Sequence, residues 1–163
     1  MAKAAKISSP PFPSGDLYER DYHAWCLAQA RALRERRFDQ VDWLNVAEEI
    51  EDLGKRERRA LRSRIMQLIE HLLKLAYARP RMFQNNARGW ELSVRNAREA
   101  VRESLADNPS LRAEADRLLI AAYRSARNEA LKSQRLPDPA IPEAAPWTFA
   151  QIIDDAFLPD RHG

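Results

Sequence analysis

Glycine is scarce in this chain, and its scarcity excludes a large group of nucleotide-binding sites. The 163 residues contain four glycines, at positions 15, 54, 89 and 163, and no two of them are near each other. Rossmann folds and P-loops need clustered glycines, because only then can the backbone approach a bound phosphate. We therefore expect no nucleotide-dependent chemistry of these two classes and no cofactor.

Cysteine and long apolar runs are also nearly absent. The single cysteine, Cys26, excludes an internal disulfide and suits a reducing compartment. No run approaches the roughly 18 apolar residues that cross a bilayer. The first 16 residues, MAKAAKISSPPFPSGD, lack the apolar segment of a secretory signal. Together these features predict a cytoplasmic protein without a membrane partner.

Lysine is rare, although the chain is slightly basic. Five of the 27 cationic residues are lysines, and 24 acidic residues leave a net charge of +3. Arginine forks onto phosphate oxygens, but a composition rich in arginine and alanine is also typical of a GC-rich genome. The charge therefore permits a nucleic-acid partner without requiring one.

What the sequence does contain is helical periodicity. Apolar residues predict a first helix over about residues 17–36, with Asp16 as its N-cap, and one long helix over about 41–78. A third helix ends at Asn108-Pro109, and Ser110 then caps a fourth helix. No segment shows convincing strand alternation. The fold class is therefore all-α, an up-and-down bundle of about four main helices, one of them long.

The predicted domain organisation is simple. Residues 1–16 should form a flexible arm, and 17–158 a single helical domain followed by a tail, 159–163. Within the domain, residues 136–158 form a proline-rich strap and a short helix capped by Thr148. The strap has too many apolar side chains for a free segment, so we expect it to pack back on the bundle.

The long helix shows one continuous apolar stripe. Because the stripe stays in phase past Gly54, the helix should continue through this glycine, with at most a bend. A missing side chain inside the stripe would let another helix come close at Gly54. The residues expected to face the core are Trp43, Ala47, Ile50, Gly54, Leu61, Ile65, Leu68, Leu72 and Leu75.

Three stretches resemble a known family. They are the run from Tyr18 to Tyr77, the short NPSL, and PWTFAQIIDDAFLP near the end, with residues 43–74 the most specific part. Together they are similar to the bacterial family known as domain of unknown function number twenty-nine. The resemblance implies an all-α fold in a small bacterial protein. It implies no activity and assigns a role to no residue.

The acidic cluster before Gly54 is a candidate metal site. Glu48 and Glu49 lie on opposite sides of the helix, about 140° and 120° from the stripe, so both should face water. The Glu-x-x-His pairs of di-iron bundles are missing. Glu19, His23 and Cys26 share one edge of the first helix, but no fourth zinc ligand is evident nearby. We expect no bound metal.

A polar pocket is the alternative that would make the protein an enzyme. Its candidate residues are Glu51, Glu57, Arg64, His71 and Arg98. Glu57 falls within the stripe, where a buried carboxylate needs a partner such as Arg64. Glu51 and His71 border the core, but 20 residues of helix, about 30 Å, separate them. No catalytic set follows from the sequence, and a non-enzyme is favoured.

Two further hypotheses concern macromolecular partners. The basic stretch after Gly54 could face a nucleic acid, through Lys55, Arg56, Arg58, Arg59 and Arg62. No aromatic residues interleave with these cations, so a stacking platform for single strands is absent. The favoured hypothesis is a protein-interaction or self-associating module, because the aromatic residues are numerous for a small bundle and a two-fold dimer would cover them.

Overall fold

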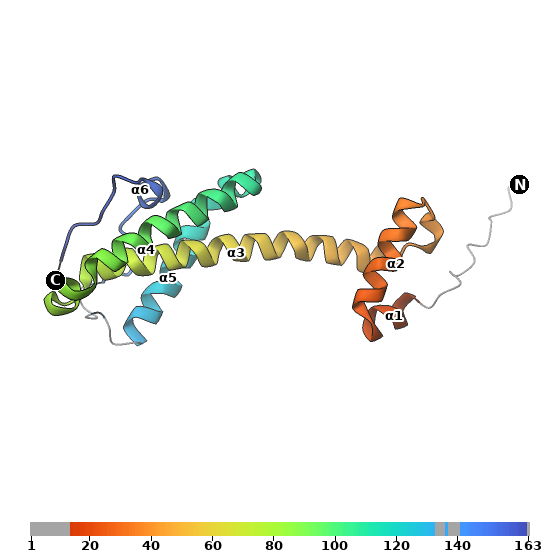
Figure 1. Cartoon of the computed structure of the whole chain (residues 1–163), viewed down its shortest axis with the longest axis horizontal. Helices are drawn as coiled ribbons and strands as arrows, with labels where there is room; N and C mark the ends of the chain where they lie inside the picture. The colour runs from red at the N-terminus through yellow and green to blue at the C-terminus, as the bar shows by residue number, and fades with distance from the viewer. Residues whose placement is uncertain (1–13, 133–135, 137–140, 163) are drawn as a thin grey trace, which may run out of the picture. The chain divides into compact units, whose positions relative to one another are not determined.

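The computed structural model is all-α, as predicted, and describes residues 14–132, 136 and 141–162 (Figure 1). Six α-helices and two short 3-10 helices make up its regular structure, and the described residues contain no strand. Contacts within the chain divide it into two compact units, Met1–Gly54 and Lys55–Gly163. We refer to these as the N-terminal and the C-terminal unit.

The long helix is confirmed. Helix α3 spans Trp43–Tyr77 without a break at Gly54, and the boundary between the two units falls within it. Its first turn follows Asp42, whose carboxylate accepts a hydrogen bond from the side chain of Asn45 at 2.8 Å. Gly54 has helical neighbours on both sides, so the continuous phase of the stripe was the correct guide at this glycine.

The N-terminal unit begins with two helices where one was expected. Helix α1 spans Ser14–Arg20 and helix α2 spans Tyr22–Arg34. Asp21 separates them with non-helical torsion angles, and its carboxylate accepts a hydrogen bond from the Ala24 amide at 2.9 Å. An aspartate in this role starts a new helix. The prediction of one helix capped by Asp16 was therefore wrong.

A tight turn leads from α2 toward α3. Arg36 has a φ of 57°, in the left-handed region, and the Arg37 amide donates to the Ala32 carbonyl. The 3-10 helix η1, Phe38–Gln40, follows. Side-chain oxygen Oε1 of the buried Gln29 then accepts from the Asp42 amide at 2.8 Å, which fixes the start of α3 against α2.

The C-terminal unit contains the main core. The rest of α3 packs with helices α4, Pro80–Asp107, and α5, Ala115–Lys132, which are joined by the 3-10 helix η2, Pro109–Glu114. The stripe residues that were predicted for this part of α3 are buried. Their fully or nearly fully buried side chains are Leu61, Ile65, Leu68, Leu72 and Leu75.

Pro80 and Ser110 lie at the two connections between the helices of this unit. Helix α3 ends at Tyr77, and Pro80 is then the first residue of α4, where its missing amide hydrogen has no cost. Asn108 ends α4, as predicted. Ser110 does not cap the next helix, because it lies inside η2 and α5 begins only at Ala115.

The described residues of the strap pack on the core of the C-terminal unit. Ile141 and Ile152 are buried, and Trp147 and Phe157 pack against the same core. Thr148 caps helix α6, Phe149–Ile153, in a capping box with Gln151. Capping at this point stabilises a helix of only five residues. The strap therefore holds its shape through local hydrogen bonds as well as through burial.

Replacing Leu72 with alanine should destabilise the C-terminal unit. Leu72 is fully buried, so Leu72→Ala leaves a cavity and should lower the free energy of unfolding by about 3 kcal/mol. Urea unfolding followed by circular dichroism measures this change. The matched control is Leu92→Ala on α4, where the leucine is 53% exposed and the expected change is within about 0.5 kcal/mol. Equal effects of the two variants would contradict this assignment of the core.

Candidate functional surfaces

Exposed apolar side chains concentrate in the N-terminal unit. Among the described residues, twelve large apolar side chains are exposed, and nine of them lie between residues 17 and 53. Leu44 is 80% exposed, the highest value among them. A monomeric soluble domain exposes single apolar residues as a matter of course, but a contiguous apolar surface is typical of an interaction site.

The first three turns of α3 present the most continuous part of this surface. We call Trp43, Ala47, Ile50, Leu53 and Gly54 the apolar strip, because helical spacing puts them within about 120° of one another around α3. Trp43, Ile50 and Leu53 are 56%, 63% and 56% exposed. A Cβ atom placed at Gly54 would meet no described atom within 4 Å. The predictions that Trp43, Ala47 and Ile50 face the core and that a helix lies close to Gly54 were therefore wrong.

Trp43 is fixed in position at one end of the strip. Its indole Nε1 donates a hydrogen bond to the Phe38 carbonyl at 3.2 Å. The Phe38 ring lies 6.3 Å from the Trp43 ring and is itself 53% exposed, so it extends the apolar surface onto η1. An aromatic anchor that is already held in place loses little conformational entropy when it is covered.

Glu49 ties α3 to the two preceding helices. Its carboxylate accepts hydrogen bonds from the hydroxyl groups of Tyr18, at 2.7 Å, and Tyr22, at 2.6 Å. These bonds and the nearby negative charge raise the pKa of Tyr18 to about 12, and the pKa of Tyr22 is raised as well. Both tyrosine rings pack on the buried Trp25, with centroids at 4.8 and 5.8 Å.

The acidic cluster therefore divides into different environments. Glu48 and Glu51 are exposed, as expected for Glu48, whereas Glu49 is half-buried, contrary to expectation. Among the described residues, no group of three or more His, Cys, Asp or Glu side chains is placed to bind a metal ion, and Glu19, His23 and Cys26 form no such group. Glu49 acts as a hydrogen-bond acceptor between helices.

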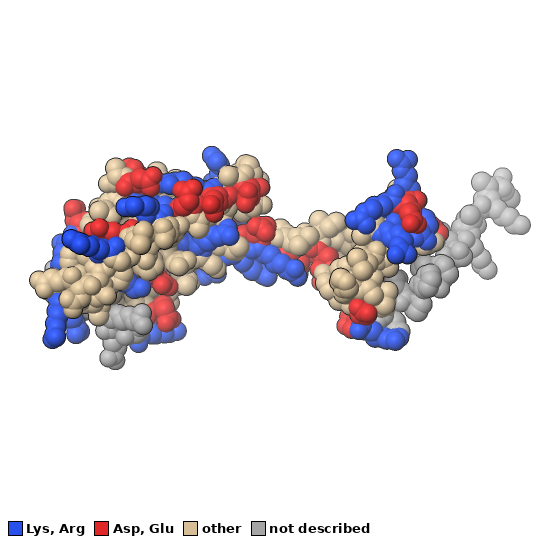
Figure 2. All heavy atoms as spheres, in the orientation of Figure 1, with Lys and Arg blue, Asp and Glu red and all other residues tan. Residues whose placement is uncertain are grey.

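Part of the basic stretch after Gly54 is engaged within the C-terminal unit. Arg58 forms an ion pair with Glu114 at 2.7 Å, and Arg62 donates to the Ser125 hydroxyl at 2.7 Å. Lys55, Arg56 and Arg59 are exposed. Figure 2 shows cationic side chains along the middle of α3. The stretch thus combines interhelical contacts with a solvated basic surface.

Among the remaining candidates for a polar pocket, Glu57 and Arg64 are linked through Asn108 and Ser104, because the Asn108 side chain also donates to the Ser104 carbonyl at 3.4 Å. Glu57 is exposed, contrary to expectation, and accepts a hydrogen bond from the Asn108 side chain at 3.3 Å. Arg64 donates to the Ser104 hydroxyl. His71 is half-buried, its Nδ1 has no hydrogen-bond partner in the described part of the chain, and burial lowers its pKa.

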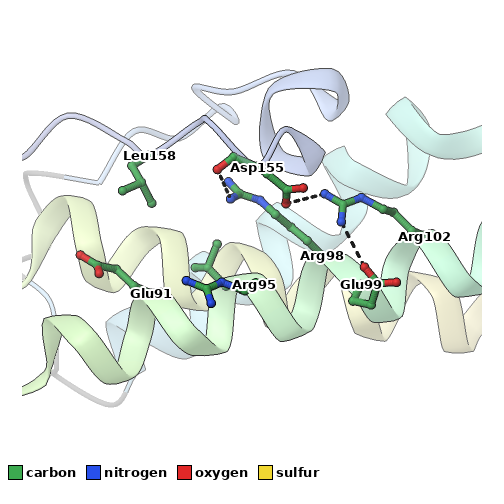
Figure 3. Close-up of a pocket in the computed structure, with 8 residues that line it drawn as sticks. Glu91, Arg95, Arg98, Glu99, Arg102, Asp155 and Leu158 are labelled. Atoms are coloured by element: carbon green, nitrogen blue, oxygen red, sulfur yellow. Dashed lines mark hydrogen bonds and ion pairs between the residues drawn. The ribbon is translucent and has the colours of Figure 1, made fainter.

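A polar hollow lies instead between α4 and the segment after α6 (Figure 3). Its volume is about 480 Å³. Three arginines and three carboxylates line it together with two apolar side chains. The lining residues are Glu91, Val94, Arg95, Arg98, Glu99, Arg102, Asp155 and Leu158. Of the five predicted pocket residues only Arg98 is among them.

Arg98 joins α4 to the strap. It is 3% exposed, and its three nitrogens donate to the carbonyl oxygens of Ile152 at 2.8 Å, Asp155 at 3.4 Å and Phe157 at 2.5 Å. Burial lowers the pKa of this guanidinium, and the negative charge of Asp155 partly offsets the shift. A guanidinium surrounded by carbonyl groups satisfies backbone acceptors that would otherwise be buried without donors.

Arg102 makes the second link between the same elements. It donates to the Ile153 carbonyl at 2.9 Å and to the Asp155 carboxylate at 2.5 Å, which lowers the pKa of Asp155. A third bond reaches Glu99 at 3.1 Å. One signal for this pair is present in the sequence, since Arg98 and Arg102 each follow a residue of the buried α4 stripe, Ala97 and Val101. Arg98 and Arg102 therefore hold the strap on α4, and we call these two arginines and their bonds the clamp.

Replacing Arg98 with lysine should weaken this clamp. An ammonium group cannot fork onto three carbonyl oxygens, so Arg98→Lys should lower the free energy of unfolding by about 2 kcal/mol. Urea unfolding measures the change, and tryptophan fluorescence, to which Trp147 contributes beside the three other tryptophans, follows the strap in part, because the Trp147 ring lies 6.2 Å from that of Phe157. The control Arg95→Lys changes an exposed residue of the same hollow. An unaltered stability of Arg98→Lys would exclude the clamp.

Replacing Glu49 with glutamine should lower the raised tyrosine pKa values. Without the carboxylate, Tyr18 should titrate nearer 10 than 12, as should Tyr22. A pKa raised by folding contributes stability below the unfolded pKa, near 10, and the contribution is lost as pH rises through the folded pKa. Absorbance at the tyrosinate band between about pH 9 and 13 records all four tyrosines, so the difference between the wild-type and Glu49→Gln curves isolates Tyr18 and Tyr22. Glu51→Gln is the control, and equal titrations of both variants would argue against the bonds to Glu49.

No helix in the described part of the chain combines the length and the apolar character that crossing a membrane requires. No curated protein and no solved structure matches the chain. The family model described as Domain of unknown function DUF29 matches residues 17–158, which cover both units apart from the chain ends. The match includes all three stretches that suggested the resemblance, except the final Pro159. The chain therefore belongs to the DUF29 family.

Proposed function

We propose that this protein is a protein-interaction module and that its docking surface is the apolar strip of the N-terminal unit with Phe38 beside it. The observation that supports the proposal is the exposure of Ile50, Leu53 and Trp43 on one side of helix α3. Aromatic and aliphatic side chains at the centre of a surface are the usual anchors of protein partners.

The burial of apolar residues within the N-terminal unit supports the same conclusion. In its described part the buried apolar residues are Trp25, Ala32 and Val41, against nine large apolar residues that are exposed. Complete burial of one Leu, Ile or Phe side chain contributes about 1.5–3 kcal/mol. Covering the strip would therefore add stabilisation comparable to that of the unit's own small core.

The C-terminal unit buries most of its large apolar side chains within its own core. Its core combines residues of α3, α4, α5, the strap and α6, and the exposed large apolar residues in its described part are Leu92, Ile120 and Leu158. These three lie on different elements. The contrast between the two units supports a docking surface on the N-terminal one.

The two alternatives have weaker support. A nucleic-acid surface would use the cations after Gly54, but Arg58 and Arg62 bind Glu114 and Ser125. An enzyme would need a polar site, and the hollow at Arg98 already uses its arginines for backbone carbonyls and Asp155. Neither alternative accounts for the exposed strip.

A charged residue in the strip should abolish docking. Wild-type protein and Ile50→Asp are each immobilised and exposed to a lysate of the source cells, and bound proteins, added copies of the chain included, are quantified by mass spectrometry. An anchor contributes about 2 kcal/mol or more, so binding to Ile50→Asp should fall at least about tenfold.

The matched control is Arg59→Asp, which puts the same aspartate on α3 about 180° away from Ile50 around the helix. Arg59 is exposed. Circular dichroism must show equal helix content in all three proteins. If Ile50→Asp binds the same proteins in the same amounts as the wild type, the strip is not the docking surface and the proposed function is wrong.

A further inference from the structure

We infer that the partner on the apolar strip is a second copy of this chain, whose α3 packs antiparallel to the first. This inference rests on the proposed function and specifies the partner. It depends on the spacing of the strip residues, on their alternating size and on the area that they expose.

The spacing is that of a coiled-coil seam. Trp43, Ala47, Ile50 and Gly54 follow one another at intervals of four, three and four residues. This alternation puts side chains on the narrow side of a helix that faces one partner helix. The strip is therefore suited to a second helix rather than to a broad sheet or an extended peptide.

The sizes of these residues favour an antiparallel second copy. If two strips run in opposite directions about a point between Glu48 and Glu49, Trp43 of one copy meets Gly54 of the other, and Ala47 meets Ile50. Each layer then combines a large side chain with a small one, as close packing requires. No described atom lies within 4 Å of a Cβ placed at Gly54, so the indole has room there.

A parallel pair would pack poorly. In register, it would put Trp43 on Trp43 and Ile50 on Ile50, but Ala47 on Ala47 and Gly54 on Gly54. The two indoles would hold the helices apart, and the small residues would then leave voids. A helix of an unrelated protein could fill the same seam, but only the antiparallel second copy supplies complementary layers from this sequence alone.

Residues beside the seam extend the contact. Val46 of one copy faces Leu53 of the other across one flank, and Leu44 lies along the opposite flank, where it meets the stem of Glu51. With side chains of roughly 150–200 Å², the exposed fractions of Trp43, Leu44, Ile50 and Leu53 amount to about 450 Å² per copy. Two copies, with Phe38 and the flanks, would bury about 1,000 Å², the lower bound for a specific interface.

The acidic cluster sets a condition on this pairing. Eight acidic side chains would lie near the two-fold axis, four from each copy, namely Glu48, Glu49, Glu51 and Asp52. Helical spacing puts them at the sides and back of the seam, not within it. Repulsion between charges near a surface is screened by salt. Association should therefore strengthen as salt rises from about 0.05 to 0.5 M, unlike binding to a nucleic acid, which salt weakens.

Sedimentation equilibrium tests the second copy. From about 1 to 100 μM, a range that covers small interfaces, the wild type and Arg59→Asp should dimerise, whereas Ile50→Asp should need at least about tenfold higher concentration. If the wild type stays monomeric over this whole range, the inference of a second copy is wrong. The proposed function would still hold if Ile50→Asp also loses a partner that the wild type binds from the lysate. If Ile50→Asp dimerises at the same concentration as the wild type, self-association uses another surface and the inference is wrong.

Spin labels test the direction. Glu48→Cys and Lys55→Cys, each in a Cys26→Ser background, put one label at equivalent positions of successive heptads. Antiparallel pairing about residues 48 and 49 offsets the two copies' labels along the helix by about 2 Å at position 48 and about 20 Å at position 55. The label-to-label distance at 55 must therefore exceed that at 48. Equal distances would demonstrate a parallel pair and overturn the antiparallel assignment.

Discussion

Helix α3 must be covered along one side, because its apolar stripe continues through most of its 35 residues. From Leu61 onward α4, α5 and the strap supply that cover. Before Gly54 the same side of the helix is exposed at Trp43 and Ile50. One helix thus has a filled stripe in the C-terminal unit and an unfilled stripe in the N-terminal unit. The proposed docking surface rests on this difference.

Polar side chains keep both parts of α3 in position. In the N-terminal unit the Glu49 carboxylate accepts hydrogen bonds from two tyrosine hydroxyl groups, and the Gln29 side chain accepts one from the Asp42 amide. In the C-terminal unit Arg58 and Arg62 bind Glu114 and Ser125. Residues that suggested a metal site or a nucleic-acid surface in the sequence therefore serve partly as contacts between helices. Arg98 has the corresponding role for the strap, where it replaces solvent as the donor to three carbonyl groups.

Periodicity was sufficient to predict the helices but not what covers them. It located α3 through Gly54, the buried stripe from Leu61 to Leu75 and the cap at Thr148, because these depend on residues close in the chain. It misplaced Trp43, Ala47 and Ile50, since an apolar side needs a neighbour, and the sequence does not reveal whether the chain provides one. It also missed Arg102 and Asp155, which lie 53 residues apart and meet only after the strap has folded back.

The continuity of α3 across the boundary between the units has a consequence for local opening. Backbone amides exchange their hydrogens with solvent only when a segment unfolds, and the required free energy follows the burial around that segment. Turns around the fully buried Leu68 would open only with the whole C-terminal core, whereas turns around the exposed Ile50 would open with the smaller N-terminal unit. A single helix would then display two exchange regimes, and a ligand on its first turns would slow exchange there without any change at its far end.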